Sequence, residues 1–285
     1  SSPSRGLGDV YKRQENMCGI IGYSGPKEPL PILINGLSRL EYRGYDSAGI
    51  AISDGNKITV EKKEGKLDVL KNHLKDSNIK GNIGIGHTRW ATHGVPNDVN
   101  AHPHSDNSEE FAIIHNGIIE NYAEIKKDLL EEGFEFKSDT DTEVVAVELS
   151  RKWNGELLRT VTDVAKTLEG TYALVVTTTK EEGTIVAGRL MSPLVLGVGE
   201  NEVFLASDSA AILEHTNKMI FLENGDFVEI KNGEYKLFDA DLNEIEREIQ
   251  EIDWEVSEAE KLGYDHFMYK DCLLYTSDAA DDIPR

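Results

Sequence analysis

The sequence predicts an α+β fold in which antiparallel β-sheets are covered by helices. Strand-like apolar runs come in consecutive groups and do not alternate strictly with helical patterns, which favours antiparallel sheets. Two Asn-Gly hairpin signals, "ENGD" and "KNGE", lie in the second half of the chain. Without its two flanks the chain has about 255 residues, which one large domain can hold.

The first half of the chain contains both periodicities. Five short apolar runs read as strands: "CGIIGY", "AGIAIS", "KITVEKK", "GNIGIGH" and "FAIIHNG". In "PLPILINGLSRLEY" the large aliphatic residues recur at helical spacing, which predicts a helix from about residue 29. "NYAEIKKDLLEEG" and "DTEVVAVELSRKW" also read as helices, and the Asp and Thr residues of "SDTDTE" suit the N-cap of the second.

The second half reads mainly as strands. "TYALVVTTT", "GTIVAGRL", "PLVLGVG" and "EVFLASD" are rich in β-branched residues and follow one another closely. After about Ala240 the chain turns polar and acidic, which suits an edge helix or the start of a linker.

Composition narrows the class of protein. The net charge is −22, from 52 acidic and 30 basic residues, which disfavours binding to nucleic acid or to anionic membranes. No apolar run approaches the roughly 18 residues of a membrane helix. With Cys272 assigned to a flank, one cysteine remains, so neither a disulfide framework nor a cysteine-based zinc site is expected. The expected compartment is the cytoplasm.

Both ends of the chain are predicted to be non-native. The peptides "DVYKRQ" (9–14) and "CLLYTS" (272–277) can be encoded by opposite strands of one short DNA sequence, which is typical of translated library adapter. Residues 1–16 and 272–285 are therefore not expected to belong to the fold. The alternative is a natural disordered tail.

Cys18 follows Met17 and begins an apolar strand. The simple interpretation is a buried small cysteine. If Met17 is the true start and is removed, Cys18 instead carries a free α-amine beside its thiol. That amine has a pKa near ~8, close to operating pH, whereas a lysine near ~10.4 is a poor proton acceptor. A terminal cysteine is thus a nucleophile that carries its own base.

The stretch "GHTRWATHGVPNDVNAHPHSD" (86–106) is rich in polar side chains. Its four histidines suggest a metal site, but no acidic or cysteine ligand at a familiar spacing accompanies them, so no metal is predicted. The alternative is that each histidine is an ordinary loop or strand-end residue whose ring is hydrogen-bonded within the protein. Arg89 can hold a carboxylate through two parallel bonds, and the adjacent Trp90 can exclude water. A surface salt bridge beside a packed tryptophan is the alternative.

Two more motifs carry candidate site residues. In "HNGIIEN" the Asn116 amide and the Gly117 N–H can form an oxyanion hole, although Asn-Gly is often only a turn. In "SDTDTE" Asp141 can present a carboxylate to an ammonium group, or the stretch can be only a helix cap.

Together the motifs resemble one family. "MCGIIGYSG", "RLEYRGYDSAG", "HTRWATHG", "NAHPH", "HNGIIENY" and "SDTDTEV" are similar, in this order, to the glutaminase domain of the glutamine–fructose-6-phosphate aminotransferases, also called glucosamine-6-phosphate synthases. These are class II glutamine amidotransferases with the N-terminal-nucleophile hydrolase fold, a four-layer α/β/β/α sandwich. The resemblance implies an amidotransferase domain over residues 17–240, with its C-terminal edge and the start of a linker over 241–271.

The resemblance also implies roles for the site residues and requires no cofactor. Cys18 attacks the glutamine amide, Asn116 and Gly117 stabilise the oxyanion, Arg89 clamps the α-carboxylate and Asp141 binds the α-ammonium. Further roles are implied for four residues around the glutamine: Thr92 and His93 line its loop, Trp90 covers it, and Arg43 stands behind the site and orients the Cys18 end.

Two departures from the family pattern limit the expected activity. The family's sugar-phosphate isomerase domain, which accepts the ammonia, would follow the linker, so this chain is expected to perform only the glutaminase half. Full-length family enzymes are homo-oligomers held together mainly by that domain, so a monomer is expected here. With residues 1–16 attached, the Cys18 nitrogen is an amide and cannot act as a base.

The alternatives are the glutaminase half of another class II amidotransferase and a non-catalytic glutamine-binding module.

Overall fold

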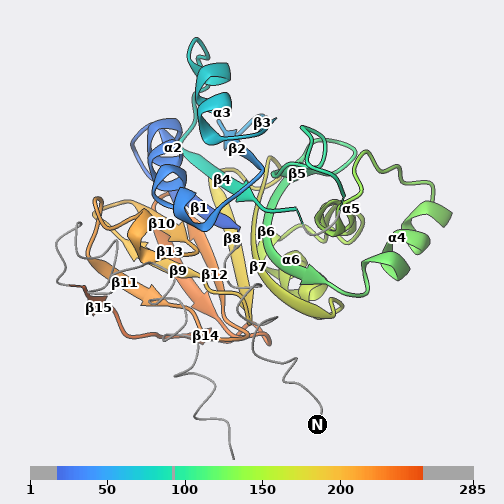
Figure 1. The fold of residues 1–285 in the computed structure, drawn as a ribbon. Helices are drawn as coiled ribbons and strands as arrows, with labels where there is room; N and C mark the ends of the chain where they lie inside the picture. Colours follow the sequence, from blue (N-terminus) through green and yellow to red (C-terminus); the bar gives the residue numbers. More distant parts are fainter. Residues whose placement is uncertain (1–17, 92–93, 253–285) are drawn as a thin grey trace, which may run out of the picture.

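Two antiparallel sheets lie face to face, with helices on both outer sides (Figure 1). This computed structural model describes residues 18–91 and 94–252. It confirms the α+β prediction and the four-layer α/β/β/α order. Among the described residues, no helix is long and apolar enough to cross a membrane.

The first sheet carries the N-terminal end of the fold near its centre. Its order is β15-β11-β9-β10-β1-β4-β2-β3. The strands are β1 (Gly19–Ser24), β2 (Ser47–Ser53), β3 (Ile58–Glu64), β4 (Ile83–Arg89), β9 (Val195–Val198), β10 (Val203–Ala206), β11 (Lys218–Phe221) and β15 (Gln250–Glu251). In the β1–β4 ladder Gly19 pairs with Thr88, so Cys18 meets the chain where it leaves β4.

The second sheet has the order β14-β13-β12-β8-β7-β6-β5. Its strands are β5 (His104–Ser105), β6 (Phe111–Ile119), β7 (Gly170–Thr178), β8 (Thr184–Leu190), β12 (Phe227–Lys231), β13 (Glu234–Phe238) and β14 (Glu244–Ile245). The long pair β6–β7 runs from Phe111 opposite Thr178 to Ile119 opposite Gly170. This pair brings the "HNG" motif toward the first sheet.

Helices cover the outer face of each sheet. On the first sheet, α2 (Pro29–Arg39) packs on β1 and β4, and α3 (Leu67–Leu74) packs on β2 and β3. On the second sheet, α5 (Asp141–Arg151) packs on β6 and α6 (Leu157–Ala165) on β8, while α4 (Tyr122–Glu131) packs against α5. Two short 3₁₀ turns, η1 (Glu41–Arg43) and η2 (Ser209–Ala211), complete the described elements.

Strand alternation divides the core into layers. Ile20 points into the cluster between the two sheets, where it meets Ile114 and Val175. Its neighbour Ile21 points the opposite way, into the cluster beneath α2 that contains Leu37. Because side chains alternate across a strand, β1 is buried on both faces. The position of Cys18 at its start is therefore firmly held.

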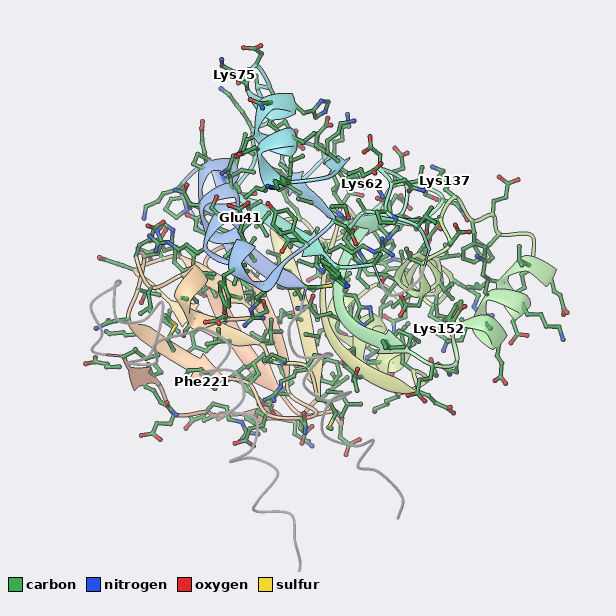
Figure 2. All side chains as sticks on the ribbon, in the orientation of Figure 1. Glu41, Lys62, Lys75, Lys137, Lys152 and Phe221 are labelled. Atoms are coloured by element: carbon green, nitrogen blue, oxygen red, sulfur yellow. The ribbon has the colours of Figure 1, made fainter. Side chains whose placement is uncertain are left out.

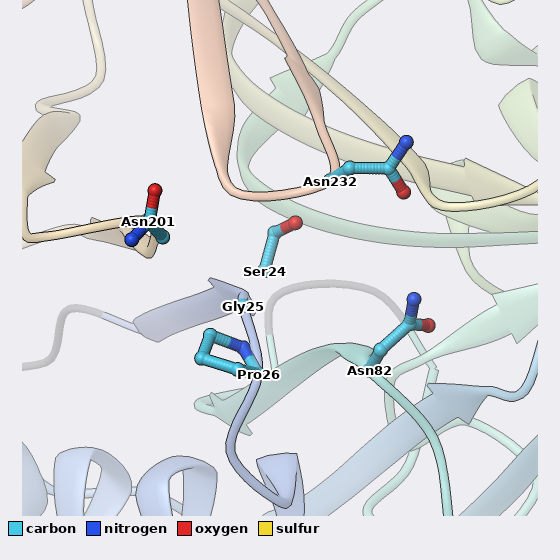
Figure 3. A pocket seen from close by; sticks show the side chains of 6 residues that line it. All are labelled: Ser24, Gly25, Pro26, Asn82, Asn201 and Asn232. Atoms are coloured by element: carbon cyan, nitrogen blue, oxygen red, sulfur yellow. The ribbon is translucent and has the colours of Figure 1, made fainter.

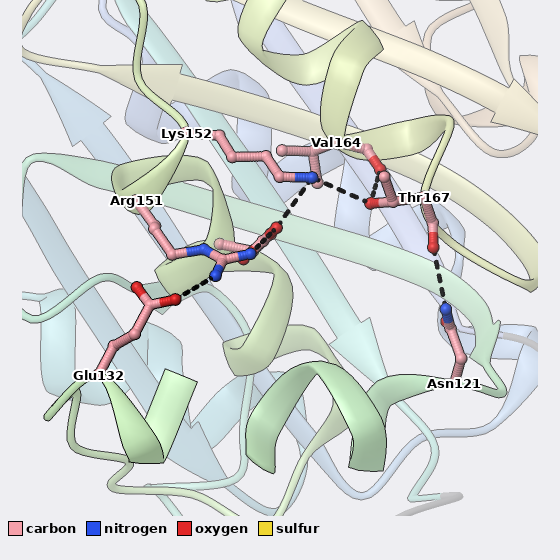
Figure 4. A network of polar contacts seen from close by, with 7 residues as sticks. Asn121, Glu132, Arg151, Lys152, Val164 and Thr167 are labelled. Carbon is pink, nitrogen blue, oxygen red and sulfur yellow. Dashed lines mark hydrogen bonds and ion pairs between the residues drawn. The ribbon is translucent and has the colours of Figure 1, made fainter. Parts of the chain in front are cut away.

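A polar network fastens the outer helices α4, α5 and α6 to one another (Figure 4). Arg151 donates to Glu132 at 2.6 Å and to the buried Glu148 at 2.8 Å. Lys152 lies 3.0 Å from the same Glu148 carboxylate and 3.5 Å from the Thr167 hydroxyl. These contacts hold the end of α5, whose beginning carries Asp141.

Most of the predicted elements are confirmed, and two local interpretations are wrong. "ENGD" is not a hairpin turn, because β11 and β12 belong to different sheets; "KNGE" does join the paired strands β12 and β13. Over residues 241–252 the structure has two short edge strands, and the rest of the polar segment lies outside the described residues, so the expectation of an edge helix or a linker is not decided. "HNG" does not end its strand, because β7 pairs with β6 through Ile119.

Candidate active site

Cys18 lies where β1 meets the end of β4. The Gly19 N–H donates to the Thr88 hydroxyl at 3.2 Å, which fixes the backbone beside the cysteine. The Trp90 N–H donates to Cys18 Sγ at 3.2 Å. The sulfur is therefore directed at the segment that follows β4, where a substrate can lie beside it.

The surroundings of Cys18 hold its proton on the thiol. Burial raises the pKa of the Cys18 thiol, and the carboxylate of Asp46 acts in the same direction. The Trp90 N–H and the charge of Arg89 lower this pKa but do not outweigh burial. A thiol with a raised pKa needs a base before it can attack, since the thiolate is the nucleophile.

The structure places Asn116 against Cys18. Asn116 Nδ2 donates to the Cys18 carbonyl oxygen at 2.9 Å. An amide NH₂ has two protons, so a second remains for another acceptor. Gly117 follows at φ 127°, and a Cβ there would lie 2.0 Å from the Thr171 oxygen, so only glycine fits this bend of β6. The predicted oxyanion pair thus lies next to the cysteine.

Arg89 and Asp141 are both buried near this point, with 3% and 5% of their surfaces exposed. Arg89 is the last residue of β4. Asp141 is the first residue of α5, and its Oδ2 accepts from the Ile119 N–H at 2.9 Å. A carboxylate in the first turn of a helix is favoured by the helix dipole. Thr140 caps this helix by accepting from the Glu143 N–H, as the cap prediction required.

Arg43 reaches the Cys18 end indirectly. It is buried and forms an ion pair with Asp208 at 2.9 Å. Asp208 follows Ser207, whose hydroxyl accepts from the Ile20 N–H at 3.0 Å. This path links Arg43 to the start of β1, and its role in orienting the Cys18 end stays a prediction.

Sequence reasoning assigned no role to Asp46, although it lies in the quoted "EYRGYDSAG" motif. Its Oδ2 accepts from the Ala91 N–H at 2.6 Å, and its own N–H donates to the Arg89 oxygen at 2.7 Å. Asp46 therefore holds both sides of Trp90. No periodicity or spacing could have found this, because the contact joins the residue before β2 to the segment after β4.

His87, His102 and His104 of the polar stretch form a buried cluster. The rings of His87 and His102 stack at 4.3 Å between centroids, and His104 meets His102 edge-on at 4.7 Å. His102 and His104 contact the hydroxyls of Thr142 and Thr140, at 2.9 and 3.0 Å. The cluster thereby supports the start of α5. The described residues contain no group of three or more His, Cys, Asp or Glu that could hold a metal ion.

Lys62 of β3 holds the segment that carries these histidines (Figure 2). Its ammonium donates to the carbonyl oxygens of Val99 and Ala101, at 2.9 and 2.7 Å. Burial lowers the pKa of Lys62 to about 8. The loop between β4 and β5 is thus tied to the first sheet.

Not every predicted residue can be placed. Thr92 and His93 lie outside the described residues, whereas Trp90 is 38% exposed beside the cysteine. A surface hollow of about 280 Å³ lies at the far end of β1 from Cys18 (Figure 3). It is lined by Ser24, Gly25, Pro26, Asn82, Asn201 and Asn232.

The fold and the site define a class of protein. A cysteine directly before a central strand, beside an Asn-Gly pair in a four-layer sandwich, is the arrangement of an amide-cleaving N-terminal-nucleophile enzyme. The family model described as "Glutamine amidotransferase domain" matches residues 72–253. The chain belongs to this family.

Two curated relatives indicate which glutamine amidotransferases the chain is similar to. The chain is 51% identical over 255 residues to the glutamine–fructose-6-phosphate aminotransferase [isomerizing] of Clostridium perfringens, and 50% identical over 256 residues to that of Fusobacterium nucleatum. Each match covers 90% of this chain and 42% of the relative. The chain therefore spans about two-fifths of the length of these relatives.

A solved structure supports the fold. The glutamine phosphoribosylpyrophosphate amidotransferase of B. subtilis, in complex with ADP and GMP, superposes with a TM-score of 0.70 at 28% identity. The match covers 80% of this chain and 50% of that one.

Proposed function

We propose that this chain hydrolyses glutamine to glutamate and ammonia, with Cys18 as nucleophile, once the Cys18 nitrogen is a free amine. One observation carries the proposal: the Cys18 backbone accepts from Asn116 at 2.9 Å while its sulfur accepts from the Trp90 N–H at 3.2 Å. The nucleophile and a donor for the oxyanion are thus adjacent.

The first steps follow from these positions. The α-amine of Cys18, with a pKa near ~8, takes the thiol proton, directly or through a water. The thiolate attacks the amide carbon of glutamine. The second N–H of Asn116 and the N–H of Gly117 hold the resulting oxyanion. The ammonium of Cys18 then returns the proton to the leaving nitrogen, and ammonia departs.

The second half of the reaction consumes water. Expulsion of ammonia leaves a γ-glutamyl thioester on Cys18. The α-amine removes a proton from water, which attacks the thioester through a second oxyanion in the same pocket. The C–S bond breaks, the sulfur regains its proton, and glutamate leaves.

Arg89 and Asp141 are proposed to hold the two charged ends of the substrate. Arg89 is a buried guanidinium at the end of β4, where a planar two-bond clamp suits an α-carboxylate. Asp141 Oδ2 accepts a hydrogen bond from the Ile119 N–H of β6, and the remaining lone pairs of the carboxylate can accept from an α-ammonium. Trp90, exposed beside them, is proposed to cover the bound glutamine, with Thr92 and His93 along its loop.

The ammonia is proposed to serve the amination of fructose 6-phosphate to glucosamine 6-phosphate. The names of the relatives support this fate, as does the 90% of this chain that the similarity covers. The acceptor would be a sugar-phosphate isomerase domain of the whole enzyme, which is proposed to be cytoplasmic and homo-oligomeric. The glutaminase part is proposed to be a monomer by itself.

The test compares two versions of the chain. The described fold begins at Cys18, so starting translation at Met17 removes none of it. After methionine removal this version should release glutamate from glutamine, while the chain as printed, with an amide at Cys18, should be nearly inactive. Cys18→Ala in the shorter version should abolish turnover. Equal turnover by both versions would contradict the role of the amine.

An electrophilic glutamine analogue separates an enzyme from a binding module. Diazo-oxo-norleucine should alkylate Cys18 in the version that begins at Met17, and intact mass should increase by one adduct. A module that binds glutamine without catalysis would bind the analogue and remain unmodified.

A further inference from the structure

Asn116 can serve an oxyanion only if its amide has one particular orientation. Its Nδ2 must face Cys18, and its Oδ1 must face away. A side-chain amide is nearly symmetric in shape, so packing alone barely distinguishes the two orientations. The orientation must therefore be fixed by a neighbouring group that can only donate, or only accept, a hydrogen bond. The neighbour in contact with Oδ1 is His87.

His87 Nε2 lies 2.9 Å from Asn116 Oδ1 and 3.0 Å from the His115 carbonyl oxygen. A carbonyl oxygen can only accept, so Nε2 must carry a proton. Because the same Nε2–H faces Asn116, the atom of Asn116 that meets it must also accept. The network therefore fixes Oδ1 on the side of His87 and Nδ2 on the side of Cys18.

The protonation state of His87 agrees with this arrangement. Burial is the largest cause that lowers the pKa of His87, to about 3, so the ring is neutral at physiological pH. A neutral imidazole carries one proton, and Nε2 has it. Nδ1 is then a bare lone pair, and it has no hydrogen-bond partner in the described structure. The ring itself is held by stacking on His102.

We infer that His87 is a positioning residue for the glutaminase reaction, because its Nε2–H locks the Asn116 amide in the orientation that presents Nδ2 to Cys18 and to the oxyanion. This inference rests on the proposed function. A flipped amide would set its NH₂ against the Nε2–H and its oxygen against the Cys18 carbonyl, so both contacts would become repulsive. His87 does not touch the substrate in this arrangement and acts only through Asn116.

Two substitutions of nearly equal length test the donor. His87→Gln keeps an N–H at the end of the side chain, whereas His87→Met has none. In the chain that begins at Met17, His87→Met should lower kcat about tenfold to a hundredfold, part of the loss expected for a whole oxyanion donor. The KM for glutamine should stay within about twofold, and His87→Gln should recover most of kcat.

A double-mutant cycle separates positioning from general damage. Asn116→Ala removes the amide, so adding His87→Met to it should change kcat by less than about twofold. His215→Phe is the matched control, since that histidine also stacks on an aromatic ring, Phe204, at 4.9 Å. Its kcat should equal that of the parent. If His87→Met fails to fold, His87→Phe, which keeps the ring stacked on His102, replaces it.

Three results would overturn the inference while the proposed function stood: an unchanged kcat in His87→Met, an equal loss in the Asn116→Ala background, or a change in KM alone. An independent test measures the tautomer of His87 and does not require the chain to turn over glutamine. Nitrogen NMR of His87 at neutral pH should find Nε2 protonated and Nδ1 bare. A proton on Nδ1 would overturn the inference even if the chain proved inactive, whereas inactivity itself would count against the proposed function.

Discussion

Gly117→Ala is the substitution whose outcome the geometry specifies most closely. Gly117 has φ 127°, and a Cβ there would lie 2.0 Å from the Thr171 carbonyl oxygen on the neighbouring strand. That oxygen belongs to the backbone and cannot rotate away, so β6 and β7 must separate by about 1 Å. Adopting this φ costs an L-residue about 1–3 kcal/mol, and the weakened ladder bond adds about 1 kcal/mol. The free energy of unfolding should therefore fall by about 2–4 kcal/mol.

The same shift should impair catalysis. Asn116 precedes Gly117 in β6 and lies 2.9 Å from the Cys18 oxygen, so a separation of the strands displaces both proposed oxyanion donors. A misplacement of about 1 Å can cost about 10²-fold in rate. Urea unfolding measures the first effect. Glutamate release at saturating glutamine, in the chain that begins at Met17, measures the second.

Gly133→Ala is the matched control. Gly133 also has a positive φ, 92°, but a Cβ there meets nothing within 4 Å. It should lose about 1 kcal/mol of stability and keep its full kcat. If Gly117→Ala behaved like Gly133→Ala in both assays, the close approach to Thr171 would not constrain the site, and the reasoning would be wrong.

Three further predictions concern binding, acid stability and packing. Arg89→Lys should raise the KM for glutamine about 10- to 100-fold with little change in unfolding, because a point charge cannot reproduce the two-bond clamp. Stability should fall as pH drops below about 6.5, since His87, His102 and His104 all have lowered pKa values in the fold and bind protons only when it unfolds. The slope of the free energy of unfolding against pH should approach about 4 kcal/mol per pH unit, because three histidines each bind one proton on unfolding and each proton contributes about 1.36 kcal/mol per pH unit. Leu37→Ala should cost about 2–5 kcal/mol, because Leu37 is fully buried on the inner face of α2.

Each of these predictions has a control variant or a result that would refute it. An unchanged KM in Arg89→Lys would refute the clamp. His104→Phe should reduce the acid slope, measured by urea titration from pH 7.5 to 5.5, by about one third; a flat profile in the parent would show that the histidines titrate freely. Val69→Ala, at a site 46% exposed on α3, should change stability by no more than about 0.5 kcal/mol. A similar small loss in Leu37→Ala would argue against tight packing beneath α2.

Much of the fold could be read from local patterns. The aliphatic repeat of α2 and the apolar runs of β1 and β2 are strong signals, because α2 buries one face and both strands are buried along their whole length. Two helices were not anticipated, α3 and α6, and both are short. The "ENGD" turn was misread because its backbone chemistry suits a hairpin, while the partners of the two strands lie in different sheets.

The site was found only through several motifs taken together. Cys18, Arg89 and Asn116 each had an ordinary structural interpretation, and none was convincing by itself. Asp46 and His87 illustrate the limit, because their roles arise from contacts with residues 45 and 29 positions away. No periodicity encodes such contacts.

The sequence by itself determined the elements, the family and the residue types able to cleave an amide. These depend on local backbone preferences, on side-chain chemistry and on the order of motifs along the chain. Only the tertiary structure decided which side chains meet and in which orientation. Pairing of β1 with β4, and packing of that sheet on β6, bring the Cys18 backbone, the Asn116 amide and the buried His87 imidazole into one hydrogen-bonded chain. Burial then sets their protonation, and burial is a property of the folded chain alone.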